Sequence, residues 1–194
     1  MAHRFNDRFH ARLTDPRRRR LQPAGPALRL LGLSRAHVFL DLGCGPGYFL
    51  LPAAARVKTA WGLDVSPVMI RAARKNAADA GRDNVRLRRV GERRLPLAAN
   101  SADRALMTNV LHELVSPEGT LAEIFRILAP GGRLLLVDWR PGGSRRGPPK
   151  SECIPSRRAR KMLKDAGFDG VTAHGIYREQ WALLARRPGG GAGD

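Results

Sequence analysis

The fold is decided by one stretch, His37–Gly47, with the sequence HVFLDLGCGPG. The apolar run over residues 37–42 predicts a buried strand, and glycines follow it at once. Glycines after a buried strand let the backbone turn tightly and approach a ligand closely. A helix is predicted over residues 48–56, interrupted early by Pro52, and its first N–H groups would face that ligand. In open α/β sheets, ligands bind in this crevice at the carboxyl ends of the strands.

The spacing of Gly43, Gly45 and Gly47 is G-x-G-x-G, which differs from two common phosphate-binding patterns. A dinucleotide site of the NAD type would place its third glycine at position 48, where this chain has Tyr48. The sequence contains no GK[ST] tripeptide, which excludes a P-loop.

Strands and helices alternate outward from this loop, which predicts an α/β fold with a mostly parallel sheet. Apolar runs predict further strands at 59–64, 85–90, 103–108 and 133–139, and a closing antiparallel pair at 168–176 and 180–185. Helices are predicted at 27–32, 67–80, 117–129 and 156–166. Ser66 and Ser116 each precede a proline, the arrangement expected where a helix begins.

The domain organisation follows from length and composition. With 194 residues and 43% hydrophobic residues, we expect one domain over residues 28–187, preceded by an irregular arm over 1–27 and followed by a flexible Gly-rich tail over 188–194. The arm is short enough to serve as a lid. No apolar window approaches 18 residues and the N-terminus lacks a secretory pattern, so we expect a soluble cytoplasmic protein without a membrane partner. Two cysteines are too few for a disulfide framework or a four-thiolate zinc site, and no metal is expected.

The charge is strongly basic, with 35 Lys and Arg against 17 Asp and Glu and a net charge of +18. Only five of these basic residues are lysines, which leaves 30 arginines. A basic protein of this size can hold nucleic acid or another polyanion. The other explanation is GC-rich codon usage, which enriches Arg, Ala, Gly and Pro together. The arginines are scattered over nearly every segment, which favours the second explanation.

The segment Asp41–Gly47 resembles the first motif of class I S-adenosylmethionine-dependent methyltransferases, and later landmarks follow in the order typical of that family. These are Asp64 at the end of the second strand, Arg94–Leu97 followed by Ala102-Asp103, Asn109–Leu114, and Arg126–Arg133. The resemblance covers residues 37–139. The remainder resembles a smaller bacterial and archaeal group of methyltransferase-domain proteins, through Asp138-Trp139, Gly147-Pro148-Pro149 and an arm beginning His3-Arg4-Phe5.

The resemblance implies a Rossmann-like seven-stranded sheet of order 3-2-1-4-5-7-6, with the last strand antiparallel and helices on both faces. It also implies S-adenosyl-L-methionine as the cofactor. The three glycines would lie against the methionine part of this cofactor, and Asp41 would face its ammonium group directly or through water. Asp64, followed by Val65, would accept hydrogen bonds from the two ribose hydroxyls.

Two further pairs of residues complete the cofactor site that the resemblance implies. Glu92 and Arg93 lie at the end of the third strand, where the family places its adenine contacts. The family has an acid followed by a small residue there, and Arg93 departs from that pattern. Asn109 and Val110 would lie beside the sulfonium.

His112 and Glu113 are the candidate catalytic residues, because they follow Asn109 at the rim of the methyl-transfer site. Histidine takes up a proton near neutral pH, so His112 is the first candidate for a general base and Glu113 the second. Each has a structural alternative, since Glu113 can cap the next segment and His112 can pack beneath it. No covalent nucleophile is expected, and neither Cys44 nor Cys153 is well placed to be one.

Three functions remain open at this point. The first is direct in-line methyl transfer to a small-molecule acceptor, with the arm excluding water. The second is methylation of RNA or the ribosome, using the basic surface. The third is a non-catalytic scaffold that binds the cofactor. A homodimer is compatible with each of them.

Overall fold

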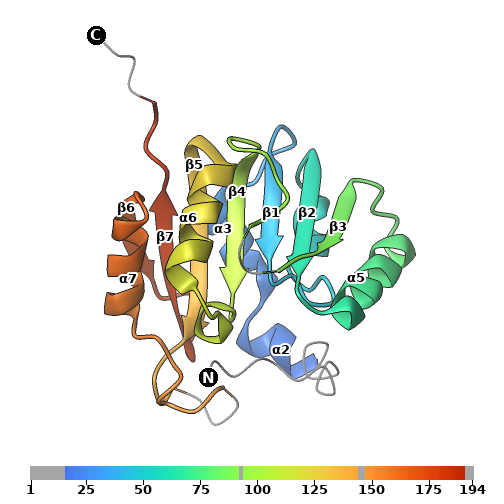
Figure 1. The fold of residues 1–194 in the computed structure, drawn as a ribbon. Coiled ribbons are helices and arrows are strands. Elements are labelled where there is room, and N and C mark those ends of the chain that lie inside the picture. The colour runs from blue at the N-terminus through green and yellow to red at the C-terminus, as the bar shows by residue number, and fades with distance from the viewer. Residues whose placement is uncertain (1–15, 92–93, 144–146, 191–194) are drawn as a thin grey trace.

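The computed structural model describes residues 16–91, 94–143 and 147–190 (Figure 1). Its strands are β1 Val38–Leu42, β2 Thr59–Asp64, β3 Val85–Arg89, β4 Ala102–Thr108, β5 Leu128–Trp139, β6 Asp169–His174 and β7 Gln180–Arg186. Its α-helices are α2 Pro16–Leu21, α3 Ala24–Leu31, α4 Leu50–Ala54, α5 Pro67–Asp79, α6 Pro117–Ile127 and α7 Ser156–Asp165, and a 3₁₀ turn, η2, covers Leu111–Glu113.

The strands form one sheet in the order β3-β2-β1-β4-β5-β7-β6. β7 runs antiparallel to both of its neighbours, β5 and β6, and the other pairs are parallel. This confirms the predicted fold and strand order. In β5, Leu134–Val137 are fully buried, as expected of a strand covered on both faces.

Helices cover both faces of the sheet and create two hydrophobic cores (Figure 1). On one face, α6 and α7 pack on alternate residues of the central strands, including Leu40, Met107 and Leu136. On the other face, α3 and α4 pack on the intervening residues, including Phe39, Leu106 and Leu135. Alternate residues of each strand enter different cores, because successive side chains of a strand point to opposite faces of the sheet.

Two elements differ in length from the prediction, for reasons of hydrogen bonding. The helix predicted over 48–56 spans only Leu50–Ala54. Near its start Pro52 has no N–H to donate to Tyr48, and after its end Arg56 N donates to the Ala53 carbonyl in a tighter turn. Strand β5 begins at Leu128 rather than Arg133, so the Pro130-Gly131-Gly132 turn that was expected to separate helix from strand lies within it. There the Gly131 N–H donates to the Arg187 carbonyl and the Arg187 N–H donates to the Gly132 carbonyl, which extends the sheet.

The prediction of an irregular arm over residues 1–27 is wrong for its second half. Residues 16–21 form α2, and the boundary predicted between residues 27 and 28 falls inside α3, where Ala27 and Leu28 are buried in the core. An apolar helix face outweighs the local Pro and Gly residues here, because burial stabilises the helix. Residues 1–15 and 191–194 lie outside the described parts of the chain, so the predicted lid and flexible tail end remain predictions.

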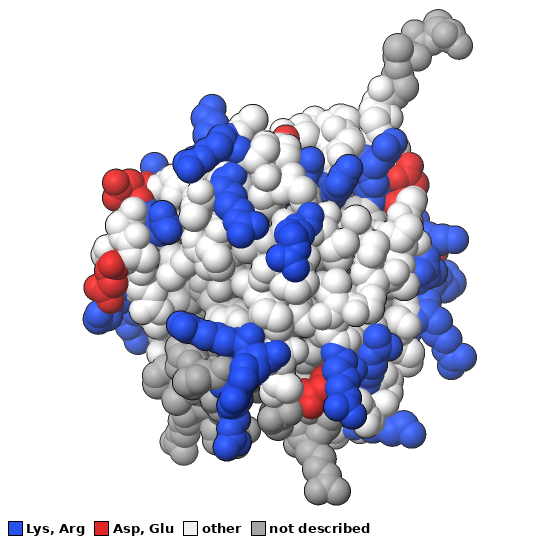
Figure 2. All heavy atoms as spheres, turned by 180° about the vertical axis from the view of Figure 1, so that it is seen from behind, with Lys and Arg blue, Asp and Glu red and all other residues white. Residues whose placement is uncertain are grey.

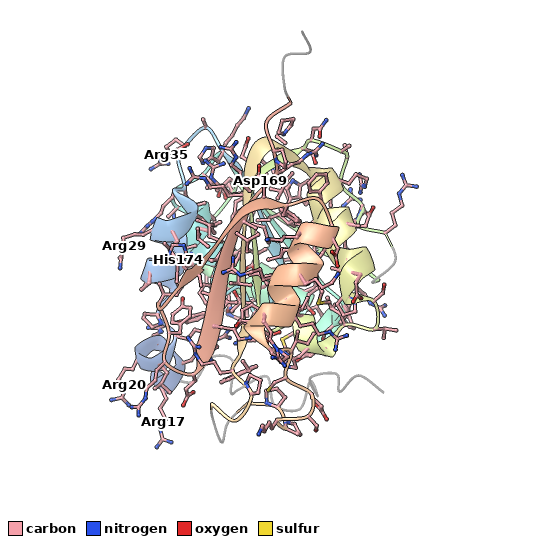
Figure 3. All side chains as sticks on the ribbon, turned by 90° about the vertical axis from the view of Figure 1, so that its left-hand side faces the viewer. Arg17, Arg20, Arg29, Arg35, Asp169 and His174 are labelled. Atoms are coloured by element: carbon pink, nitrogen blue, oxygen red, sulfur yellow. The ribbon has the colours of Figure 1, made fainter. Side chains whose placement is uncertain are left out.

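The basic side chains are distributed over the surface in several separate groups. Figure 2 shows such groups with uncharged surface between them on the face opposite that of Figure 1. In Figure 3, Arg17, Arg20, Arg29 and Arg35 follow one edge of the molecule and extend outward. Within the described ranges, no helix is long and apolar enough to cross a membrane.

A substitution at Gly62 tests the packing that holds the glycine loop against the sheet. A Cβ added there would lie 2.6 Å from Leu50 Cδ2, 2.7 Å from Leu87 Cδ2 and 3.0 Å from Cys44 Sγ. Gly62→Ala should therefore lower the free energy of unfolding by about 1–3 kcal/mol, measured by denaturant titration. The control is Gly175→Ala, where the added Cβ meets open space. Equal stabilities of the two variants would contradict this packing.

Candidate functional site

The glycine loop lies against the residues that follow β4. The backbone N–H groups of Gly43 and Cys44 both donate to the Leu63 carbonyl, at 2.8 and 3.1 Å. Gly43 has a φ of 72°, and a Cβ at this position would lie 2.2 Å from Val110 Cγ2. Only glycine combines this backbone conformation with this close approach. The loop after β1 and the loop after β4 therefore form one surface at the carboxyl ends of the strands.

Asp64 connects the end of β2 to the glycine loop. Its Oδ2 accepts a hydrogen bond from Gly45 N at 2.8 Å, and its Oδ1 accepts one from Ser66 N at 2.9 Å. These two bonds fix the Asp64 carboxylate between the glycine loop and the start of α5. The adjacent Val65 is exposed, and its carbonyl accepts a hydrogen bond from Arg89. The predicted neighbours Asp41 and Asp64 do lie on adjacent strands, β1 and β2.

Asp41 is buried at the end of β1 with an unsatisfied oxygen. It is 2% exposed, and its Oδ2 has no hydrogen-bond partner among the described residues. Burial raises the pKa of Asp41 to about 7; the nearby Arg18 opposes this rise and Asp64 adds to it. Such a carboxyl group is poised for a ligand that brings a donor or a positive charge.

Asn109 lies beyond β4 in the left-handed conformation, with a φ of 58°. Its backbone N–H donates to the Val137 carbonyl at 2.8 Å, which fixes the loop to β5. Its side-chain Nδ2 donates to Gln22 Oε1 at 3.1 Å, while its Oδ1 is buried and has no partner within the described ranges. Asn109 therefore joins the segment after α2 to the end of β4.

His112 and Glu113 lie together at this edge, and Asp138 lies behind the imidazole. His112 Nδ1 is 2.7 Å from Asp138 Oδ1, and the His112 backbone N–H donates to Asp138 Oδ2 at 3.0 Å. Trp139 N also donates to Asp138, which fixes the carboxylate. The other ring nitrogen, Nε2, is 3.6 Å from Glu113 Oε1. Two backbone N–H groups, as well as the imidazole ring, therefore fix the Asp138 carboxylate against His112.

The electrostatics of His112 follow from this enclosure. Burial alone would lower the pKa of His112, because the side chain is only 5% exposed. The hydrogen bond to Asp138, together with the negative charges of Asp138, Glu113 and Glu152, outweighs burial and raises the pKa. With Asp138 accepting from Nδ1–H, the neutral ring has its lone pair on Nε2. His112 is thus a strengthened base whose accepting atom is defined.

Several functional candidates differ from those that the sequence indicated. Glu92 and Arg93 lie outside the described residues. Asp138 was not predicted as a site residue. Its place at the carboxyl end of a strand next to β4 was a signal that this acid could meet the loop after β4. Gln22 and Arg18 were not predicted as site residues, because they lie in the supposed irregular arm. Burial raises the pKa of both Cys44 and Cys153, which makes them poor nucleophiles.

Comparison with known proteins identifies the family. A family model described as a methyltransferase domain matches residues 40–136, which is 97 of the 194 residues and runs from within β1 to within β5. The chain belongs to the class I S-adenosylmethionine-dependent methyltransferases. Its cofactor is accordingly S-adenosyl-L-methionine.

The relatives of this methyltransferase include one solved structure of similar size. The crystal structure of a SAM-dependent methyltransferase from Aquifex aeolicus superposes with a TM-score of 0.88 at 26% identity, covering 95% of this chain and 100% of that one. A ubiquinone/menaquinone biosynthesis C-methyltransferase of Syntrophotalea carbinolica is 34% identical over 58% of this chain and 48% of its own length. A demethylmenaquinone methyltransferase of Tropheryma whipplei is 31% identical over 58% and 46%.

The matched part spans less than half the length of these curated relatives. Their full activities therefore do not transfer directly to this methyltransferase.

Because Asp41 is buried, the ligand-free methyltransferase should become less stable as the pH rises. The carboxyl group of Asp41 titrates near pH 7 in the folded chain but near 3.8 when unfolded, so the folded state binds more protons between these values and stability falls as the pH rises through this window. Asp41→Asn should therefore stabilise the protein by about 1–3 kcal/mol at pH 8 and by little at pH 4.

Thermal unfolding at several pH values measures this effect. The matched control is Asp165→Asn, because Asp165 is exposed and pairs with Lys161 on the surface of α7. A lower melting temperature of Asp41→Asn than of the unmodified chain at pH 8 would contradict the assignment of Asp41 as an unsatisfied buried acid.

Proposed function

We propose that this chain transfers the methyl group of S-adenosylmethionine to a small-molecule acceptor, with His112 as the general base. The observation that carries the proposal is the buried Asp138–His112 pair at the same strand edge as the glycine loop. The sulfonium supplies an activated methyl group. The protein then has to bind the two partners in line, exclude water and take up a proton if the acceptor releases one.

The residues at this edge fit the cofactor. The buried Asp41 Oδ2 has no partner among the described residues and lacks the donor that an ammonium group would provide. We assign the two hydroxyls of a ribose to the Asp64 carboxylate, which two backbone N–H groups fix beside the glycine loop. Val110 lies against Gly43 of the glycine loop, and the adjacent Asn109 donates to Gln22 Oε1; we assign both residues to the sulfonium end of the cofactor.

The proposed proton transfer uses the free nitrogen of His112. Asp138 accepts from Nδ1–H, so Nε2 takes the proton from the attacking atom of the acceptor. Asp138 then stabilises the imidazolium, and Glu113 at 3.6 Å from Nε2 adds to this stabilisation. The roles predicted for His112 and Glu113 therefore divide: His112 is the base, and Glu113 supports its charged form.

A small molecule is favoured over RNA by two considerations. Two of the relatives are named for demethylmenaquinone methylation and for ubiquinone and menaquinone biosynthesis. On the face that Figure 2 shows, the basic side chains lie in separate groups with uncharged surface between them. A radiolabelled methyl assay on cell extract, with and without prior RNase treatment, separates the alternatives. Label in the low-molecular-weight fraction supports the proposal, whereas RNase-sensitive label in macromolecules would replace it with RNA methylation.

Cofactor affinity should depend on Asp64. Asp64→Ala removes the acceptor of both ribose hydroxyls, and a charge-assisted hydrogen bond is worth about 1.5–3 kcal/mol. The affinity for S-adenosylhomocysteine should fall about ten- to a hundredfold in calorimetry. Asp79→Ala, which removes an exposed acid paired with Lys75 on α5, is the control. Unchanged affinity in Asp64→Ala would remove this residue from the site.

Catalysis should depend on His112 and should be tuned by Asp138. His112→Ala should lower kcat about 10²–10⁴-fold with near-normal affinity for S-adenosylhomocysteine. Because the base acts in its neutral form and its pKa is raised above 6.5, the rate should fall on the acid side from a pH above 6.5.

Asp138→Asn removes the charge that raises the pKa of His112, so it should move this acid limb to lower pH. The readout is the pH profile of kcat on the acceptor that the label identifies, with the outlying His174→Ala as control. A profile of Asp138→Asn that coincides with that of the unmodified enzyme would sink the base assignment.

A further inference from the structure

Three arginines lie side by side on three neighbouring strands of the sheet. Arg104 of β4 is in register with Arg133 of β5, and Arg133 is in register with Arg186 of β7. Residues in register on neighbouring strands point to the same face of the sheet. Here it is the face on which α3 packs, since Arg104 Nε donates to the Leu31 carbonyl at the end of that helix at 2.8 Å. The row therefore begins at the end of α3 and extends towards the edge strand β6.

This row places like charges opposite one another, which destabilises a sheet. Burial, followed by the charge of Arg133, lowers the pKa of Arg104, and the nearby Asp103 opposes the shift. Burial and the charges of Arg104 and Arg133 also lower the pKa of His37, again against Asp103. Within the part of the chain that the structure describes, the central guanidinium, that of Arg133, makes no hydrogen bond or ion pair.

The two outer arginines of the row line a cavity of about 440 Å³. Arg133 and Arg186 form its basic wall, and its other lining residues are Asp169, Gly170, Leu184 and Ala185. Asp169 is in register with Arg186, and its Oδ1 is 3.8 Å from Arg186 Nε. Both side chains are more than half exposed, so this ion pair is weak. The cavity thus has two guanidinium groups and one carboxylate that neutralises them only in part.

The cavity lies far from the site of methyl transfer. Arg133 precedes Asp138 by five residues on β5, which is about 16 Å along an extended strand. Figure 3 shows Asp169 and Arg35 towards one end of the molecule and Arg17 and Arg20 of α2 at the other. A ligand in the cavity would therefore not touch the cofactor or the acceptor.

We propose that this cavity is a binding site for a phosphate group, held by Arg133 and Arg186 and attracted also by the charge of Arg104. A guanidinium offers two parallel N–H donors to the oxygens of a phosphate, which makes arginine the residue best suited to this anion. A phosphate group carries nearly two negative charges at neutral pH, so one group offsets two arginines, whereas a carboxylate offsets only one. Binding would remove the repulsion within the row. The phosphate can belong to a small metabolite or to a nucleic-acid backbone.

The test measures binding by calorimetry in a chloride buffer of low ionic strength, because salt screens exposed charges. The probes are inorganic phosphate, pyrophosphate and a short single-stranded oligonucleotide. Arg133→Gln and Arg186→Gln should each weaken phosphate and pyrophosphate binding about ten- to a hundredfold, since each removes charge-assisted hydrogen bonds. Asp169→Asn removes the competing acid and should tighten binding about two- to fivefold. The affinity for S-adenosylhomocysteine should stay unchanged in all three variants and shows that they are folded.

The control is Arg71→Gln, which removes an exposed arginine of α5. An equal loss of phosphate affinity in this variant would reduce the binding to a general attraction by the net charge and overturn the proposal. Undiminished binding in the Arg133 and Arg186 variants would also overturn it. If these two variants do not fold, Asp169→Asn decides, and unchanged or weaker binding in it counts against the site. Tighter binding of pyrophosphate than of the oligonucleotide assigns the phosphate to a small metabolite, and the reverse order assigns it to nucleic acid.

Discussion

The site depends on one carboxylate, that of Asp64. Its two oxygens accept hydrogen bonds from Gly45 N and Ser66 N, so the end of β2, the glycine loop and the start of α5 are held by a single side chain. A hydrogen bond that a buried backbone N–H donates to a charged acceptor is among the stronger hydrogen bonds. The position of the loop then fixes the approach of Gly43 to Val110, and with it the position of the loop that carries His112.

Three aspartates at the same edge of the sheet differ in their hydrogen bonding. Asp64 is satisfied by backbone N–H groups, whereas Asp138 is satisfied by backbone N–H groups and by the imidazole of His112. Asp41 keeps a buried oxygen without a partner, and its pKa is raised by burial. Burying Asp41 without a partner for one oxygen lowers the stability of the fold. This has a functional explanation, because strained or unsatisfied groups persist where a ligand completes them.

The features that could be predicted are those that depend on residues close together in the sequence. The strand ends at Asp41 and Asp64 follow from apolar runs that stop at glycine or a helix cap, and the sheet order follows from the resemblance. The pairing of His112 with Asp138 was missed, because it joins residues 26 positions apart, one in the turn η2 and the other near the end of β5. The packing of residues 16–27 was also missed, since the Pro and Gly residues there indicate irregular structure unless the burial of α3 is known.

Net charge and site charge are separate properties of this molecule. The chain carries +18 overall, yet the described strand ends bring Asp41, Asp64 and Asp138 together at one edge. The cofactor is itself cationic at its sulfonium and ammonium groups and anionic only at its carboxylate. A pocket for it therefore needs acids along most of its length and one positive charge at one end. Arg18, in a helix that the sequence presents as a simple run of arginines, has its guanidinium 4.5 Å from the centre of the Tyr48 ring, just after the glycine loop. Among 30 arginines, therefore, position relative to the glycine loop distinguishes Arg18, and abundance does not.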